Sequence, residues 1–205
     1  MTQRRHERTI AAIVALLPAV AAAQTPAAGA AYPAKPIRLV VPFAPGGATD
    51  IFARLAAAEM TKTFGQQVIV DNRPGAGTTI GAELVAKAPP DGYTLLYTDL
   101  STHSIMVSLY PKLAFNPLRD FTAVAYVNAS PLWLVVHPSV NVKTVRELIA
   151  VAKRHPGTTL GNSGVGTVTH MTAEKFRLRA GIQVTPVNYK GGNTPIVAIL
   201  SGEVA

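Results

Sequence analysis

The chain has 205 residues, of which 48% are hydrophobic. It contains no cysteine, and its formal net charge is +8. This length is sufficient for one large domain or two small lobes with apolar cores. The lack of cysteine excludes disulfide bonds, thiolate metal sites, a cysteine nucleophile and attachment as a lipoprotein. The cations are scattered, and no basic run is interleaved with aromatic residues, so we expect no nucleic-acid partner.

Residues 1–23 have the pattern of a secretory signal. Three arginines within the first eight residues precede an apolar run over 10–23 that ends in three alanines. A positive start, a short apolar stretch and small residues before the cut are the parts of such a signal. The run is short for a bilayer span and contains Pro18, so a membrane anchor or a buried helix is the weaker alternative. We predict cleavage after Ala23, a periplasmic location and no membrane insertion of the mature chain.

Cleavage at that position changes the charge. Loss of three arginines and one glutamate turns 19 basic and 11 acidic residues into 16 and 10, which leaves an excess of +6. A mild positive charge is compatible with attraction of an anionic ligand, although a soluble surface explains it as simply.

An Ala/Pro/Gly-rich leader at 24–34 precedes alternating β-rich and helical patterns. Hydrophobic periodicity and turn signals predict strands at 37–43, 67–70, 94–98, 122–127, 132–136, 159–161 and 183–188, and helices at 50–64, 79–87, 104–109, 142–154, 168–180 and from 194 onwards. This alternation predicts an α/β fold with mostly parallel sheets flanked by helices. We divide it into a first lobe at 35–127 and a second lobe at 128–205.

Five loops that lead from a predicted strand into a helix are rich in glycine or hydroxyl groups. They cover 42–50, 72–79, 98–104, 161–170 and 188–193. Ligands of parallel α/β folds bind beyond the carboxyl ends of strands, where unpaired N–H groups at helix N-termini favour an anion. Each loop by itself fits an ordinary capped turn equally well. Together they indicate two lobes that present helix N-termini to a shared cleft.

Motifs of catalysis and metal binding do not fit the chain. The loop at 161–170 has neither the dinucleotide G-x-G-x-x-G spacing nor a Walker lysine, and Val165 stands in place of the last glycine of a nucleophile elbow. Histidines and carboxylates lack zinc-type spacing. A secreted hydrolase or lyase that uses Ser163 and His170 stays as the less favoured alternative. We predict no enzyme activity, no catalytic residue, no cofactor and no metal.

Several motifs follow one another in a specific order between Tyr32 and the end of the chain. They are Tyr32-Pro33 with Lys35-Pro36-Ile37, Pro42-Phe43-Ala44-Pro45-Gly46-Gly47 with Asp50, Asn72-Arg73-Pro74-Gly75-Ala76-Gly77, Pro90-Asp91-Gly92-Tyr93-Thr94-Leu95, Asp120-Phe121, Gly164-Val165-Gly166 with His170, and Tyr189-Lys190-Gly191-Gly192. In this order they resemble the tripartite tricarboxylate transporter receptor family, the Bug or TctC-type binding proteins. Thr167 and Met171 stand where serine and leucine are more typical of that family.

The resemblance implies a two-lobed periplasmic binding protein fold of type II-like form that closes on a small organic carboxylate. Such a ligand is a di- or tricarboxylate, an acidic amino acid or an aromatic acid, which the receptor passes to the membrane permease subunits of a transporter. The resemblance also implies a monomer. A sensor that signals to a membrane partner needs the same two-lobed binding fold, so this function remains an alternative. The implied ligand contacts are Phe43, Ala44, Gly46, Gly47, Asp50, Gly75, Ala76, Gly77, Ser101 and His103 in the first lobe, and Ser163, Gly164, Gly166, Thr167 and His170 in the second.

Members of this family continue beyond the position equivalent to Ala205. We therefore expect a C-terminally truncated chain, or a fragment, in which the second lobe is incomplete and the return of the chain to the first lobe is missing. Missing strands are expected to leave an unpaired edge on the first sheet.

Overall fold

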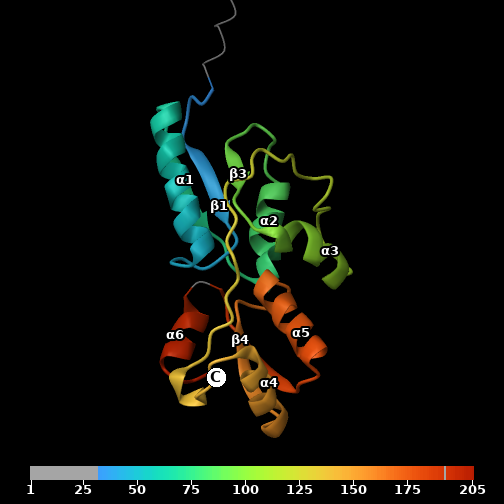
Figure 1. The fold of residues 1–205 in the computed structure, drawn as a ribbon. Coiled ribbons are helices and arrows are strands. Elements are labelled where there is room, and N and C mark those ends of the chain that lie inside the picture. Colours follow the sequence, from blue (N-terminus) through green and yellow to red (C-terminus); the bar gives the residue numbers. More distant parts are fainter. Residues whose placement is uncertain (1–31, 192) are drawn as a thin grey trace, which may run out of the picture. The chain divides into compact units, whose positions relative to one another are not determined.

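A computed structural model describes residues 32–191 and 193–205, and Tyr32–Ala205 form one unit (Figure 1). The predicted signal and most of the predicted leader lie outside the described residues. The elements are, in chain order, β1 (Ile37–Val41), α1 (Ala48–Phe64), β2 (Val68–Asn72), η1 (Ala76–Thr78), α2 (Thr79–Ala86), β3 (Thr94–Leu96), the wide turn η2 (Ser101–Ile105), α3 (Met106–Leu109), η3 (Pro138–Val140), α4 (Val145–Arg154), β4 (Thr158–Asn162), α5 (Val168–Ala180), β5 (Val184–Asn188) and α6 (Thr194–Leu200).

The strands form two parallel sheets, which confirms the predicted α/β class. The first sheet has the order β2-β1-β3, and the second pairs β4 with β5. In the first sheet, Leu39 lies opposite Val70 of β2 and Leu95 of β3. We call β1–β3 with α1–α3 the first half, and β4 and β5 with α4–α6 the second half.

Strand β1 is the centre of the first half. Its residues Leu39 and Val41 pack with Ala53 and Ala57 of α1, while the intervening Val40 is fully buried on the opposite face of the sheet. Helix α2 packs on β1 and β3, and Figure 1 shows α1 and α2 on either side of β1. A strand covered by helices on both faces is mostly apolar, and in Ile-Arg-Leu-Val-Val only Arg38 is polar. Arg38 is half-buried and forms an ion pair with Asp71 of β2.

The small residues of α1 allow its close approach to β1. Ala53 is fully buried, whereas Ala58 is on the exposed side of the same helix. Ala53→Leu is expected to destabilise the fold by about 1–3 kcal/mol, because a filled core accepts extra methylene groups only with strain. The matched change Ala58→Leu is expected to stay within about 0.5 kcal/mol. Urea unfolding of the two variants measures the difference, and equal midpoints would contradict this packing.

Helix α4 begins three residues later than the sequence pattern predicted. Thr144 Oγ1 accepts a hydrogen bond from Glu147 N at 3.2 Å, and Glu147 Oε2 accepts one from Lys143 N at 2.7 Å. This reciprocal arrangement is a capping box, which satisfies free N–H groups at a helix start. It therefore sets the first residue of α4 at Val145 rather than at residue 142.

The predicted strands at 122–127 and 132–136 are wrong, because this segment joins neither sheet. Its apolar, β-branched composition is that of a strand, but composition does not decide whether a segment pairs with a neighbouring strand, and this one pairs with none in either sheet. Tyr126 and Trp133 are 84% and 81% exposed. The segment is held in place at Asn128, whose Oδ1 accepts a 2.7 Å hydrogen bond from the Tyr97 hydroxyl.

The last residues of the predicted leader pack onto the first half. The Tyr32 hydroxyl donates to Gly92 O at 2.7 Å, and Ala34 N donates to the Tyr93 hydroxyl at 2.8 Å. The rings of Tyr32 and Tyr93 lie 5.1 Å apart. Among the helices of residues 32–205 outside position 192, none is both long and apolar enough to cross a bilayer.

Candidate functional site

Loops from the two halves meet first at the carboxyl ends of β1 and β5. A Cβ atom at Gly191 would lie 3.5 Å from Phe43 Cδ1 and 3.8 Å from Ala44 N, across the junction of the halves. A Cβ atom at Gly46 would lie 3.3 Å from Asn193 Nδ2. These are strand-to-helix loops of parallel sheets, which is where such folds bind ligands.

A second meeting point lies at the carboxyl ends of β2 and β4. A Cβ atom at Gly77 would lie 2.5 Å from Val165 O and 2.6 Å from the Tyr110 hydroxyl. On the other side, a Cβ atom at Gly166 would lie 2.9 Å from Leu109 Cδ2 and 3.4 Å from Tyr110 Cε2. Both positions therefore need glycine, because any larger residue would enter the contact between the halves.

The two meeting points gather part of the predicted site. Six predicted residues come together in them, namely Phe43, Ala44, Gly46 and Gly77 from the first half and Ser163 and Gly166 from the second. Gly75 and Gly164 approach atoms of their own half instead, with would-be Cβ atoms 2.6 Å from Ile80 Cδ1 and 2.8 Å from Tyr189 O.

Asp50 is the buried anchor of the loop after β1. Asp50 is 2% exposed, and its Oδ2 accepts hydrogen bonds from Gly46 N at 2.9 Å and Arg54 Nε at 3.0 Å. Its Oδ1 accepts a third from Asn72 Nδ2 at 2.9 Å, and the same amide nitrogen also donates to Phe43 O. Asp50 thus holds the loop in place with its own carboxylate rather than facing an anionic ligand.

Several predicted backbone contacts are already used by the protein. The N–H group of Gly46 donates to Asp50, that of Gly164 donates to Asn162 Oδ1 at 2.8 Å, and that of Gly166 donates to His170 Nδ1 at 3.3 Å. Their neighbours are free: the first N–H groups of α1, at Ala48 and Thr49, and of α5, at Val168 and Thr169, bond to no described residue. These four positions lie in the predicted loops 42–50 and 161–170, but none of them was among the predicted contact residues.

The loop before α2 has an unusual backbone. Besides two glycines, Ala76 and Thr78 have positive φ angles of 44° and 86°. Such conformations cost non-glycine residues about 1–3 kcal/mol each and are maintained by surrounding contacts. Here the buried Thr78 hydroxyl bonds Thr102 Oγ1 at 3.0 Å, and Thr102 also bonds Thr98. Strain of this kind is concentrated at functional sites, and this loop contains Gly77 of the second meeting point.

The side chains of other predicted contact residues form hydrogen bonds within the protein. Ser101 is fully buried, and its hydroxyl donates to Asp99 Oδ1. His103 Nδ1 lies 3.0 Å from Pro117 O, and its ring stands edge-on to Phe121 at 5.4 Å. Of the remaining predicted residues, Gly47 and Thr167 are the N-caps of α1 and α5.

The geometry weighs against the hydrolase alternative. A serine nucleophile needs a histidine base within hydrogen-bond reach of its hydroxyl. His170 Nδ1 instead accepts from Gly166 N, and among the described residues no hydrogen bond joins His170 to Ser163.

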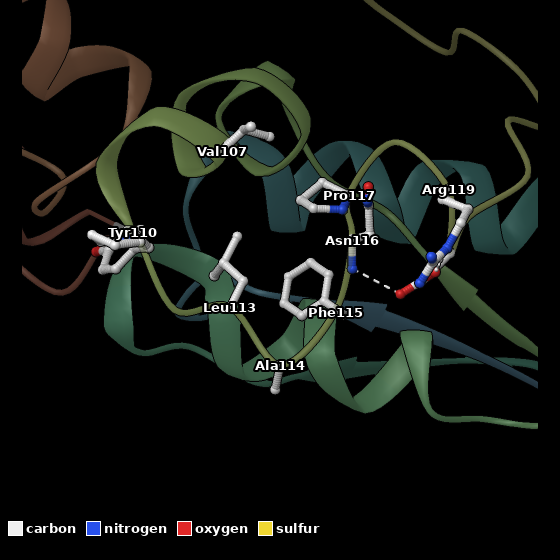
Figure 2. Close-up of a pocket in the computed structure, with 10 residues that line it drawn as sticks. Val107, Tyr110, Leu113, Ala114, Phe115, Asn116, Pro117 and Arg119 are labelled. Carbon is white, nitrogen blue, oxygen red and sulfur yellow. Dashed lines mark hydrogen bonds and ion pairs between the residues drawn. The ribbon is translucent and has the colours of Figure 1, made fainter.

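One hollow lies beside the site rather than in it. It has a volume of about 430 Å³ and lies between α3 and the segment that follows it (Figure 2). Most of its lining residues are apolar, but polar atoms make up the larger part of its exposed wall, and its charged residues, Arg119 and Asp120, form an ion pair at 2.9 Å. Asn116 N also donates to Asp120 Oδ2 at 2.7 Å. Because the two charges neutralise each other, this hollow gives a carboxylate no net attraction.

Tyr110 and Asn193 are the site residues that the sequence reasoning missed. Tyr110 ends α3 and lies at the edge of the hollow, with its hydroxyl turned away from Phe115 in Figure 2. Tyr110 belongs to no glycine motif, whereas Asn193 ends the predicted glycine loop at 188–193 but was not among the predicted contact residues. The only available signal was their place in or next to predicted strand-to-helix loops.

Two aspartates of the first half link stability to pH. Burial opposes ionisation of Asp50, but hydrogen bonds from Arg54, Gly46 N and Asn72 outweigh it and hold the pKa of Asp50 below its usual value. Burial also opposes ionisation of Asp71, but the hydrogen bonds and positive charges of Arg38 and Arg73 outweigh it and hold the pKa of Asp71 below its usual value.

We expect the protein to lose stability as the pH falls through the acidic range. A carboxyl whose pKa is lower in the folded than in the unfolded chain stabilises the fold fully above the unfolded value of about 3.9. That contribution disappears as the pH falls from there through the folded-state pKa, because protons then bind the unfolded chain more strongly. Urea unfolding from neutral pH downwards measures the loss. A free energy of unfolding that stays constant below the unfolded pKa would contradict it.

Solved structures define the class of protein. Rpa4515 of R. palustris with adipate is similar to this chain at a TM-score of 0.81 and 36% identity, over 84% of this chain and 58% of the other. MatC (Rpa3494) from Rhodopseudomonas palustris with bound malate is similar at a TM-score of 0.79 and 36% identity, over 84% and 59%. The periplasmic binding protein BugD is similar at a TM-score of 0.71 and 32% identity, over 84% and 58%. The chain therefore has the two-lobed α/β fold of periplasmic binding proteins, as predicted.

Sequence comparison then identifies the family. The family model described as "Tripartite tricarboxylate transporter family receptor" matches residues 52–205, and the chain belongs to this family. Protein BugT of Bordetella pertussis is 37% identical over 196 residues, which are 95% of this chain and 60% of BugT. A protein from Cupriavidus necator, encoded in the gbd 5' region, is 36% identical over 98% of this chain and 62% of that protein. The chain thus spans about 60% of the length of these relatives.

Proposed function

We propose that this chain is the ligand-binding part of a periplasmic receptor that captures a small organic carboxylate and hands it, unchanged, to the membrane subunits of a tripartite tricarboxylate-type transporter. The observation that carries the proposal is the meeting of glycine loops from both halves beside two helix starts. At these starts the N–H groups of Ala48, Thr49, Val168 and Thr169 have no partner among the described residues. Relatives solved with adipate and malate support a carboxylate as the ligand.

The physical basis is the positive end of each helix. Free N–H groups and the helix dipole together favour an anion by about 0.3–1 kcal/mol per charge at exposed sites and by up to about 2 kcal/mol where the site is partly buried. A carboxylate enclosed between the halves is shielded from water, which strengthens these interactions. In this proposal the N-termini of α1 and α5 hold the anion, Phe43 forms an apolar wall, and Asp50 keeps the first loop in position.

The proposal includes the processing and partners of the chain. Export with cleavage after Ala23 would deliver the receptor to the periplasm, where it acts as a monomer that docks on permease subunits. Periplasmic relatives such as BugD support this location.

Ligand-dependent stability tests the proposal. At a ligand concentration of 100 times Kd, binding stabilises the folded state by about 2.7 kcal/mol, which corresponds to a rise in Tm of roughly 5–10 °C for a chain of this size. Adipate and malate are the first probes, and adipamide, which has the shape of adipate without its charges, is the matched control. We expect a rise with a carboxylate, none with adipamide, and recovery of the ligand unchanged by NMR.

Two results would overturn the proposal. One is the absence of any shift across a panel of mono-, di- and tricarboxylates, acidic amino acids and aromatic acids at millimolar concentration. The other is chemical turnover of a probe that Ser163→Ala abolishes, which would establish the hydrolase alternative instead.

A further inference from the structure

Tyr110 lies where the two halves approach each other most closely. Its hydroxyl would be 2.6 Å from a Cβ atom at Gly77 and 3.5 Å from one at Gly166. It is the C-cap residue of α3, on a short element that belongs to neither glycine loop. The side chain of Tyr110 therefore contacts one loop from each half. At both contacts the loop residue is a glycine, which has no side chain of its own.

The hydroxyl of Tyr110 has no hydrogen-bond partner among the described residues. Four of the six tyrosine hydroxyls have a hydrogen-bond partner, in Tyr32, Tyr93, Tyr97 and Tyr189. Tyr126 has none among the described residues, but it is 84% exposed and meets water. Tyr110 alone is half-buried and without a hydrogen-bond partner in the part of the chain that the structure describes, and its hydroxyl oxygen still reaches solvent. The phenol can therefore donate to a ligand without giving up a hydrogen bond to the protein.

Few other donors are free at this meeting point. The N–H groups of Ser163, Gly164 and Gly166 donate to Thr169, Asn162 and His170, respectively. The N–H group of Gly77 has no partner among the described residues, and it lies on the loop that the Tyr110 hydroxyl contacts. This end of the site therefore offers the Tyr110 phenol, the Gly77 amide and the free N–H groups of Val168 and Thr169 at the start of α5, separate from the free N–H groups at the start of α1.

We propose that the Tyr110 hydroxyl is a specificity-determining donor that binds the second carboxylate of a dicarboxylate, while the first carboxylate lies at the N-terminus of α1. This inference rests on the proposed carboxylate-binding function and narrows its ligand class to molecules with two anionic ends. Tyr110 selects them because a monocarboxylate of the same length would place a methyl group against the hydroxyl and leave the phenol unpaired.

Isothermal titration of the full chain with adipate and hexanoate tests the inference. The two probes have the same six carbons and differ in the second carboxylate. Tyr110→Phe removes the hydroxyl and keeps the ring, and Tyr126→Phe is the matched control at an exposed position. We expect Tyr110→Phe to weaken adipate binding by about tenfold or more, since a hydrogen bond to a charged group is lost. Hexanoate binding should change by less than about twofold, and Tyr126→Phe should leave both probes unaffected.

A purely structural role for Tyr110 predicts a different pattern. In that case Tyr110→Phe would bind adipate like the unchanged protein, whereas Tyr110→Leu, which removes the ring, would lose both affinity and thermal stability. That pattern would overturn the inference, as would an equal loss of adipate and hexanoate affinity in Tyr110→Phe. If the ligand-free Tyr110→Phe variant has an unchanged Tm, the loss of adipate affinity reflects binding and not folding.

Failure of the inference and failure of the proposed function give different results. If the unchanged protein binds adipate or malate and Tyr110→Phe binds them equally well, only the role of Tyr110 is refuted. If the unchanged protein and Tyr126→Phe both fail to bind any carboxylate of the panel, the receptor function itself is refuted, and the inference falls with it.

Discussion

Gly77→Ala is expected to reduce carboxylate affinity more than any other single-atom change in the site. The added Cβ would lie 2.5 Å from Val165 O and 2.6 Å from the Tyr110 hydroxyl, so the loops of the two halves must separate or shift. Overlap of this kind costs about 2 kcal/mol, and the part that involves Val165 O, from the second half, arises only when the halves are together. A closed arrangement disfavoured by that amount weakens apparent affinity by about 30-fold. Calorimetric titration of the variant with adipate or malate measures the loss.

Gly65→Ala is the matched control for this prediction. Gly65 ends α1 with a φ angle of 65°, which is close to the 62° of Gly77, but no atom lies within 4 Å of a Cβ atom built there. Both substitutions therefore carry the same left-handed backbone cost of about 1–2 kcal/mol in stability. Only Gly77→Ala adds the collision. If both variants bind the ligand equally well, the contact between Gly77 and the second half plays no part in binding.

Asp50→Asn is expected to destabilise the first half by about 2–3 kcal/mol. The substitution keeps the shape of the side chain but removes the charge that accepts hydrogen bonds from Gly46 N, Arg54 and Asn72. Asparagine keeps one acceptor oxygen and replaces the other with an NH2 donor, so part of this set of donors loses its acceptor, and the remaining hydrogen bonds are no longer to a charged group. The full cost of a broken buried ion pair is not reached, because Arg54 is half-exposed and keeps contact with water. Urea unfolding measures the change.

An exposed aspartate of the same half provides the control for Asp50. Asp91 pairs with Lys35 at 3.4 Å, with side chains that are 43% and 61% exposed. Asp91→Asn should cost less than about 1 kcal/mol, as exposed ion pairs generally do. Asp50→Asn should also reduce the loss of stability in acid, because the group that binds the proton is gone. A small cost in Asp50→Asn, similar to that of Asp91→Asn, would show that the loop after β1 does not depend on this carboxylate.

Local patterns predicted most of the elements. The mostly apolar run of β1, interrupted only by Arg38, predicts burial on both faces, and α1 ends at Gly65, whose left-handed conformation stops a helix. Turn residues such as Pro156 and Gly157 separate α4 from β4. These features depend on neighbours in the sequence, so the sequence predicts them well.

The segment at 122–136 shows the limit of that approach. Its residues have the composition of strands, but strand formation depends on pairing with a neighbour, and in the described residues this segment pairs with neither sheet. Composition records only how well a residue fits a sheet, not whether a neighbouring strand is available.

The candidate site was predictable to the level of its loops but not of its atoms. Glycine-rich turns after β1, β2 and β4 marked the loops, and their order matched a family. Which N–H groups are free depends on side chains that fold back onto them, as Asp50 does on Gly46. In the same way, His103 was predicted in the site but bonds Pro117 O, and the unpredicted Tyr110 lies between the loops.

The sequence by itself determined the α/β class, the order of the elements and the family, because helix and strand periodicity, turn residues and motifs are encoded within short stretches of chain. Only the tertiary structure decided which loops meet, which amides remain free and where Tyr110 stands. These properties arise from contacts between residues far apart in the sequence, such as Gly77 with Val165, and such contacts exist only once both sheets have formed.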